Sequence, residues 1–144
     1  MTTTTLRHCT RIQAPASLVF KYLEDPATCA ALYPDKVTVT DIDYTPQGIG
    51  TTYRWGVGFL GLQLSVTMTR EDQVVDSRIV ERSSSGPVWT WTLTPDHDST
   101  EVALEMSLHE TVPLLDKAIM ATVGRHTDEE MIGWLEAIKK EIEV

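Results

Sequence analysis

The chain has 144 residues, of which 42% are hydrophobic, and its 21 acidic residues outweigh 12 basic ones to give a net charge of −9. This size and composition are typical of one globular domain with a real core and indicate neither a disordered nor a fibrous chain. The acidic balance argues against nucleic acids and anionic membranes as partners, because both are bound through basic patches.

Cysteine usage and the N-terminal segment indicate the compartment. Cys9 and Cys29 fit neither a CxxC nor a Cys/His metal-binding spacing, and residues 1–5 lack the apolar run of a secretory signal. No stretch approaches the length of a membrane span. We therefore expect a cytoplasmic protein with reduced thiols and with no metal or cofactor.

The chain begins with strand and short-helix patterns. Residues 6–14 alternate, with Leu6, His8, Thr10 and Ile12 on one face, which is typical of a strand. A short helix is expected from about residue 16, and Pro26 then begins a second one that ends before Pro34.

The pattern of residues 36–110 predicts six consecutive strands. Alternating or β-branched stretches cover residues 36–44, 51–57, 62–69, 75–82, 88–94 and 101–110, with turns expected at 45–48, 58–61, 71–73, 83–87 and 95–100. Short connections between successive strands favour an antiparallel meander. With the first strand at one edge, the prediction is a strongly twisted seven-stranded sheet.

Residues 113–144 predict one long amphipathic helix, which Pro113 can begin. Its apolar stripe consists of Leu115, Ile119, Val123, Met131, Trp134 or Leu135, Ile138 and Ile142. A helix of this length spans roughly 45 Å. Such a stripe requires a large concave partner, which the twisted sheet can supply.

This order of elements resembles the helix-grip superfamily (START and Bet v 1-like, or SRPBCC, proteins), which includes the polyketide cyclase/dehydrase family. Residues 12–20 (IQAPASLVF) are similar to the family's opening I-x-A-P-x-x-x-V-[FW], residues 24–26 (EDP) and 33–34 (YP) follow, and residues 48–51 (GIGT) and 99–102 (STEV) resemble its G-x-G-T and G-T-x-V motifs. The resemblance implies an α+β helix-grip fold, with residues 1–144 as a single ligand-binding domain. It also implies a cavity between the curved sheet and the long helix.

The inward faces of these elements are expected to line that cavity and to bind a hydrophobic ligand. The candidates are Trp55, Leu64, Val66, Met68, Trp89, Trp91, Leu104 and Met106 from the strands, Ile119, Val123, His126 and Trp134 from the long helix, and Tyr33 at the mouth. The alternative for each tryptophan is that it only fills the core. Tyr33 has the same alternative as a hydrophobic plug.

Arg70, Tyr53 and His8 are the candidate catalytic residues. Arg70 continues the inward series after Met68 and matches the position where the resemblance to aromatase/cyclases implies an arginine that orients or protonates the polyketide. Its alternative is a structural pair with an acidic residue such as Glu81. His8 is suited to move a proton. Its alternative is a satisfied core histidine, which is the more common role of a lone inward histidine.

Two functions follow from the resemblance. One is the cofactor-free cyclisation or dehydration of a polyketide-like substrate, and the other is non-catalytic carriage, sensing or sequestration of a hydrophobic, polyketide- or lipid-like metabolite. They differ in whether inward polar groups converge on one point. The second short helix lacks the tryptophan that is common in the family, so the substrate of a known cyclase is not a good guide to the ligand of this chain. The expected partner is a small hydrophobic molecule, and the expected assembly is a monomer or homodimer.

Overall fold

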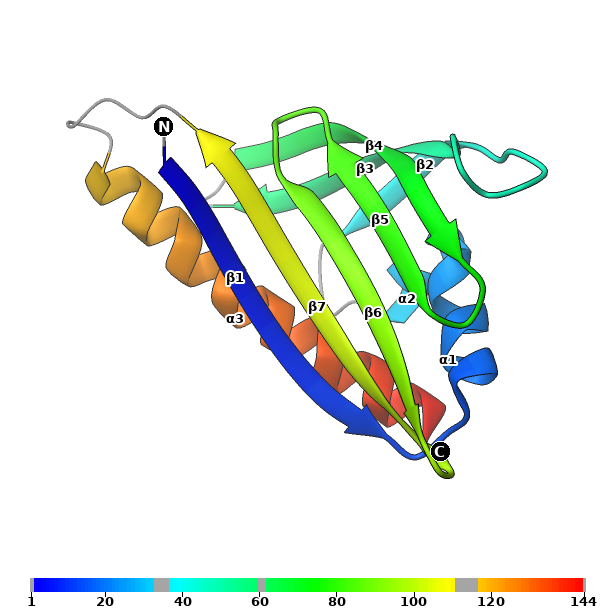
Figure 1. Ribbon diagram of the computed structural model, residues 1–144. Helices are drawn as coiled ribbons and strands as arrows, with labels where there is room; N and C mark the ends of the chain where they lie inside the picture. Colours follow the sequence, from blue (N-terminus) through cyan, green and yellow to red (C-terminus); the bar gives the residue numbers. More distant parts are fainter. Residues whose placement is uncertain (1, 33–36, 60–61, 111–116, 144) are drawn as a thin grey trace.

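The computed structural model describes residues 2–32, 37–59, 62–110 and 117–143. Seven strands form one antiparallel sheet in the order β1-β7-β6-β5-β4-β3-β2 (Figure 1). The elements in chain order are β1 (Thr2–Ile12), α1 (Ala16–Glu24), α2 (Pro26–Leu32), β2 (Thr38–Asp43), β3 (Thr52–Phe59), β4 (Leu62–Val74), β5 (Arg78–Ser83), β6 (Val88–Asp96), β7 (Ser99–Glu110) and α3 (Lys117–Ile142).

The predicted α+β architecture is confirmed, including the return of the first strand to the sheet edge. β1 pairs antiparallel with β7, so that His8 lies opposite Leu104 and Ile12 lies opposite Thr100. The sheet curves over α3, which packs along β1, while α1 and α2 lie at the other end of the sheet (Figure 1). The concave face of the sheet is therefore the one turned toward α3.

The two short helices are built from local signals. In α1, Ala16, Val19, Phe20 and Leu23 follow helical spacing and are buried against the sheet. The Asp25 carboxylate accepts a hydrogen bond from the Ala27 backbone N–H at 3.0 Å, which caps the start of α2. α1 thereby packs against β6 and β7, and α2 follows it directly.

The predicted turn at residues 71–73 is wrong. β4 continues through these residues to Val74, with a shift in its pairing with β5 between Arg70 and Asp72. This β-bulge adds one residue to β4 and so breaks the alternation of its side chains, which in the sequence looks like a turn. The chain instead reverses at residues 75–77, where Asp76 has a positive φ of 60°.

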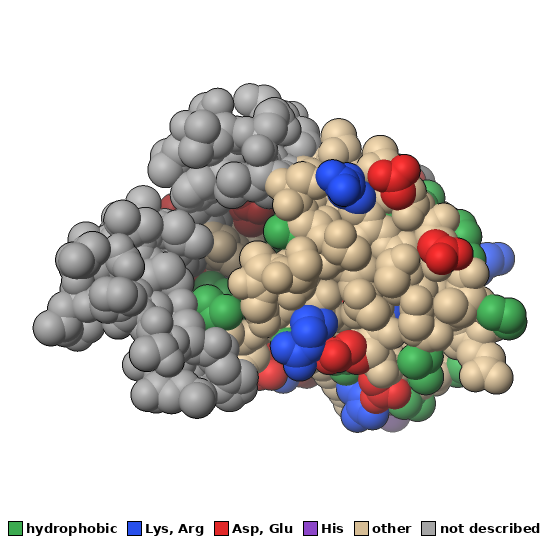
Figure 2. Space-filling model, turned by 90° about the horizontal axis from the view of Figure 1, so that it is seen from above, with side chains coloured by type: hydrophobic (Ala, Val, Ile, Leu, Met, Phe, Trp, Pro, Cys, Tyr) green, Lys and Arg blue, Asp and Glu red, His purple; other side chains and the backbone are tan. Residues whose placement is uncertain are grey.

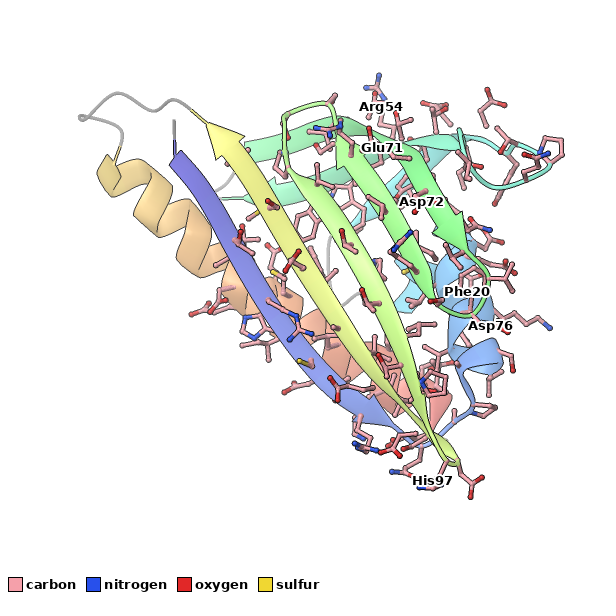
Figure 3. The ribbon with its side chains drawn as sticks, viewed as in Figure 1. Phe20, Arg54, Glu71, Asp72, Asp76 and His97 are labelled. Carbon is pink, nitrogen blue, oxygen red and sulfur yellow. The ribbon has the colours of Figure 1, made fainter. Side chains whose placement is uncertain are left out.

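Other boundaries also differ from their predicted positions, and β2 and β5 begin two and three residues later than predicted. β1 begins at Thr2 because the β-branched threonines extend its pairing with β7 as far as Glu110. The β6–β7 hairpin is tighter than expected: Pro95 pairs with Thr100, and His97 occupies the turn with a φ of 57° (Figure 3). The predicted start of the long helix at Pro113 lies outside the described residues.

The core lies between the C-terminal half of α3 and the sheet. Met131, Trp134, Leu135, Ile138 and Ile142 are buried there against residues of β1, β6, β7 and α1. Counted through either Trp134 or Leu135, these side chains recur every three or four residues, as the predicted stripe requires. The described part of α3, at 26 residues, spans about 39 Å.

The convex face of the sheet carries paired charges. Arg82 pairs with Glu71 at 2.9 Å and Arg78 pairs with Asp72 at 2.5 Å, and these four side chains are 39–53% exposed. Seen from above, charged side chains of both signs are scattered over the described surface (Figure 2). Among the described residues, no helix is both long enough and apolar enough to span a membrane.

Candidate functional site

Three polar side chains converge on the concave face. Arg70 on β4 lies directly opposite Glu81 on β5, and Tyr53 on β3 lies opposite Met68, two residues before Arg70. Because strand side chains alternate between faces, Tyr53, Arg70 and Glu81 all point to the concave face, at the end covered by α1 and α2. All three are at least 94% buried.

The Glu81 carboxylate joins the other two side chains. Its Oε2 accepts hydrogen bonds from Arg70 Nε at 3.1 Å and Nη2 at 3.0 Å, while its Oε1 accepts the Tyr53 hydroxyl at 2.5 Å. Each buried charge therefore has a partner of opposite sign and further hydrogen bonds, without which its burial would be very unfavourable.

The remaining Arg70 contacts connect this site to its surroundings. Arg70 Nη1 donates to the Glu24 carbonyl oxygen at 2.6 Å and to Gln73 Oε1 at 2.8 Å. Gln73 can reach Arg70 because the bulge puts residues 70 and 73 on the same face of β4. The turn before β3 approaches closely as well, since a Cβ on Gly48 would lie 2.4 Å from Gln73 Oε1.

The environment of Tyr53 holds its hydroxyl in the protonated form. Burial raises the pKa of Tyr53 well above its ordinary value, and the negative charge of Glu81 and the hydrogen bond to it raise that pKa further. The positive charge of Arg70 opposes these effects only in part. Tyr53 is thus a neutral hydrogen-bonding group at neutral pH.

A small pocket lies against this cluster. Its cavity volume is about 10 Å³, enough for roughly one water molecule. It is lined by Leu23, Pro26, Cys29, Val39, Tyr53, Trp55, Arg70, Glu81 and Trp91. Trp55 and Val39 are the half-buried members of this lining, and the others are buried. The pocket therefore combines aromatic walls with one polar cluster.

Tryptophans from the sheet and from α3 pack beside the pocket. The Trp134 ring lies 5.5 Å from the Trp55 ring in an edge-to-face arrangement and 5.5 Å from the Trp89 ring at an angle of 55°. Trp134 and Trp91 are buried, whereas Trp55 and Trp89 are half-buried. Such pairs stabilise the contact between α3 and the sheet by about 0.5–1.5 kcal/mol beyond area burial.

Four of the other predicted lining residues occupy the concave face. Met68, Leu104 and Met106 are buried there, and Val66 is half-buried. Leu64 lies on β4 opposite Val57, and Ile119, Val123 and His126 lie on α3, but their side chains are outside the described part of the structure, as is Tyr33 altogether.

His8 does not join Arg70 and Tyr53. Its Nε2 lies 2.5 Å from Asp128 Oδ1 on α3, and 26% of its side chain is exposed. Since β1 and β4 are four strand spacings apart, His8 and Arg70 are separated by roughly 19 Å along the sheet. His8 connects β1 to α3 instead of sharing a reaction centre with Arg70.

Sequence reasoning missed several members of the site. Glu81 was considered only as a partner for Arg70. It lies between the inward-facing Ile79 and Ser83 on β5, and an acidic residue at an inward position is a pattern from which the sequence could have predicted a site residue. Gln73 gives no such signal because its orientation depends on the bulge. Cys29 was considered only as a thiol, and its place in the pocket lining depends on how α2 packs.

Solved structures identify the fold. The Zhui aromatase/cyclase from a Streptomyces species has a TM-score of 0.80 at 19% identity, covering 99% of this chain and 94% of its own. The KanY protein has a TM-score of 0.82 at 16% identity over the whole of both chains. A START superfamily protein from Mycobacterium smegmatis has a TM-score of 0.75 at 12% identity, covering 96% and 97%.

Neither a sequence-family model nor a curated protein matches this chain. Identities below 20% with such high structural similarity establish the arrangement of the backbone, and function has to be argued from the site. The chain has the helix-grip fold shared by these START and aromatase/cyclase structures.

Proposed function

We propose that this protein binds a small, flat hydrophobic molecule of polyketide- or lipid-like character on the concave face of the sheet, where α1 and α2 cover it. The observation that carries the proposal is the pocket at Tyr53, whose walls include Trp55 and Trp91 and whose polar side is the Arg70–Glu81 pair. An apolar pocket with a few convergent polar groups is the usual form of a small-molecule site.

The polar side of this pocket suits a hydroxylated ring. Tyr53 donates its only proton to Glu81, so its oxygen keeps the capacity to accept a hydrogen bond from a ligand hydroxyl. Trp55 and Trp91 provide aromatic surface on which a flat ring can stack. Ring stacking thus provides affinity, and the Tyr53 oxygen provides orientation.

The pocket has to widen when such a ligand binds. A volume of about 10 Å³ is much smaller than a naphthalene ring. Trp55 is the aromatic lining residue that reaches solvent, so its rotation is the simplest way to open the site. The affinity of the ligand is then reduced by the free energy of that opening.

Calorimetric titration with 2-naphthol tests the binding proposal. We expect saturable binding to the wild-type protein and a loss of about fivefold in affinity for Trp91→Leu, because a stacked ring contributes about 1 kcal/mol. Tyr44→Leu is the matched control, since Tyr44 is an aromatic residue with 56% exposure outside the pocket. Equal loss in both variants, or no saturable binding to any of them, would show that the pocket is not the site.

Cofactor-free cyclisation is the second candidate function, and the convergence of Tyr53, Glu81 and Arg70 favours it. Zhui and the di-domain protein StfQ of the steffimycin pathway are described as aromatase/cyclases. In such a reaction the Glu81 carboxylate would accept a proton from a carbon next to a ketone, and the Tyr53 hydroxyl would donate to the carbonyl oxygen under attack. Ring closure and loss of water would then produce the aromatic ring.

Product analysis separates the two functions. A linear poly-β-ketone is incubated with wild-type protein and with Tyr53→Phe, and the ring products are compared with those formed spontaneously. Catalysis predicts a product distribution that the wild type changes and Tyr53→Phe does not. An unchanged distribution together with measurable 2-naphthol binding leaves a non-catalytic carrier, sensor or sequestering protein.

A further inference from the structure

We propose that Glu81 determines the charge of the ligand, so that the pocket accepts neutral hydroxylated rings and rejects carboxylates. This inference rests on the proposed binding function and names the ligand class of the same site. It follows from how completely the Arg70 guanidinium is occupied by neighbouring groups.

Arg70 alone would make this pocket a site for anions. A guanidinium has five N–H donors arranged to bind carboxylates and phosphates. Here four hydrogen bonds already engage it within the described residues: two to Glu81 Oε2, one to the Glu24 carbonyl oxygen and one to Gln73 Oε1. A ligand carboxylate therefore has to compete with partners that the fold already provides.

The Glu81 carboxylate also opposes an anion directly. It lies in the pocket lining together with Arg70, and these two are the charged members of that lining. The pair is neutral in sum, and the oxygen of Glu81 that does not bind Arg70 is bound by Tyr53. A carboxylate in the pocket would meet the negative charge of Glu81 at close range while the positive charge of Arg70 is already neutralised.

A neutral hydroxyl avoids this penalty. It needs an acceptor, and the Tyr53 oxygen and the Glu81 carboxylate both provide one. Tyr53 is held protonated, so the ligand meets a neutral phenol at neutral pH. A phenol- or enol-bearing ring consequently fits the polar side of the pocket without breaking the Arg70–Glu81 pair.

The test uses two ligands with the same ring, neutral 2-naphthol and anionic 2-naphthoate, titrated calorimetrically at pH 7. Wild type is expected to bind 2-naphthol at least about tenfold more tightly than 2-naphthoate. Glu81→Gln keeps the size of the side chain and frees the charge of Arg70, so its affinity for 2-naphthoate is expected to rise about tenfold or more, the effect of one hydrogen bond to a charged group. Glu71→Gln is the matched control, because Glu71 pairs with Arg82 on the convex face and should leave both affinities unchanged.

A variant that removes the positive charge of the pair instead of the negative one keeps the proposal testable if Glu81→Gln fails to fold. Arg70→Gln leaves the charge of Glu81 unopposed, so it is expected to gain affinity for the cationic analogue 2-naphthylmethylammonium and none for 2-naphthoate. The double variant Arg70→Gln/Glu81→Gln removes both charges and should gain neither ion. Gains in Glu81→Gln or Arg70→Gln that match these signs support the proposal.

Two results overturn the inference, and they differ from a failure of the proposed function. If wild type binds 2-naphthol and 2-naphthoate equally well, or if Glu71→Gln changes the preference as much as Glu81→Gln, the pocket binds ligands but Glu81 does not select their charge. If none of the folded variants binds any of the three ligands, the binding function itself is wrong.

Discussion

Removing one member of the buried Arg70–Glu81 pair should destabilise the protein far more than removing one member of an exposed pair. Arg70→Met deletes the guanidinium and leaves the Glu81 carboxylate buried, with Tyr53 as the partner that remains among those described here. Breaking a buried ion pair from one side destabilises a protein by about 3–5 kcal/mol. The entropy of unfolding for 144 residues is about 0.3 kcal/mol/K, so the melting temperature should fall by roughly 10–17 °C.

Arg82→Met provides the comparison on the same sheet. Arg82 pairs with Glu71 at 2.9 Å, but both side chains are more than 40% exposed, so the loss should be about 1 kcal/mol or less. Chemical unfolding followed by circular dichroism at neutral pH measures both variants. The unfolding transition should keep its steepness, which shows that the same surface is exposed in each variant.

The double variant Arg70→Met/Glu81→Leu separates pairing from burial. Replacing both charges by apolar side chains is often close to neutral, so it should recover most of the stability lost in Arg70→Met. The unpaired Tyr53 hydroxyl should keep the double variant about 1–3 kcal/mol below wild type. The reasoning is refuted if Arg70→Met is no less stable than Arg82→Met, or if the double variant loses the sum of the two single changes.

Three further predictions concern titration and the turn before β3. Tyr53 should stay protonated in the folded protein when exposed tyrosines ionise, because burial and Glu81 raise its pKa above the ordinary value of 10.0. The stability that its protonated form contributes is therefore complete below pH 10 and is lost as pH rises through the folded-state pKa. The phenolate absorbance of native wild type and of Tyr53→Phe should coincide until unfolding. Glu143→Gln should remove stability that wild type has above pH 4.5, since the hydrogen bond from Lys139 lowers the pKa of Glu143. The two proteins should become equally stable as pH falls through that lowered pKa. A stability difference that persists in strong acid would contradict this prediction. Gly48→Ala should destabilise the protein by about 1–3 kcal/mol in thermal unfolding, because Gly48 has a φ of 85° and a Cβ there would overlap the Gln73 amide. A variant as stable as wild type would count against this close approach.

The fold was predictable because its signals are local and repeated. Alternation in strands such as residues 88–94 and the stripe of Met131, Trp134 and Ile138 specify which faces are apolar, and one concave sheet around one helix is the simplest way to bury both. The positions of Arg70 and Tyr53 on the inward face follow from the same alternation. Side-chain period alone was enough to bring these two residues to one surface.

The details of the site were not predictable because they depend on irregular backbone. The bulge between Arg70 and Asp72 has no signature in the alternation of β4, so Gln73 was assigned to a turn instead of to the inward face. His8 was placed correctly on the inward face, but its contact with Asp128 depends on where α3 crosses β1. The alternation of β5 places Glu81 inward, yet only the cross-strand register puts it opposite Arg70 and within reach of Tyr53.

The central claim is that the pocket beside Tyr53 binds a flat hydroxylated ring, and the indole N–H resonances of the protein test it most directly. The chain has four tryptophans, so each indole N–H can be assigned by single substitution and followed by NMR during titration with 2-naphthol. The indoles of Trp55 and Trp91 line the pocket and should show the largest saturable shifts, with smaller changes at Trp89 and Trp134. Shifts confined to residues outside the pocket, or indole resonances that do not respond at saturating ligand, would contradict the account.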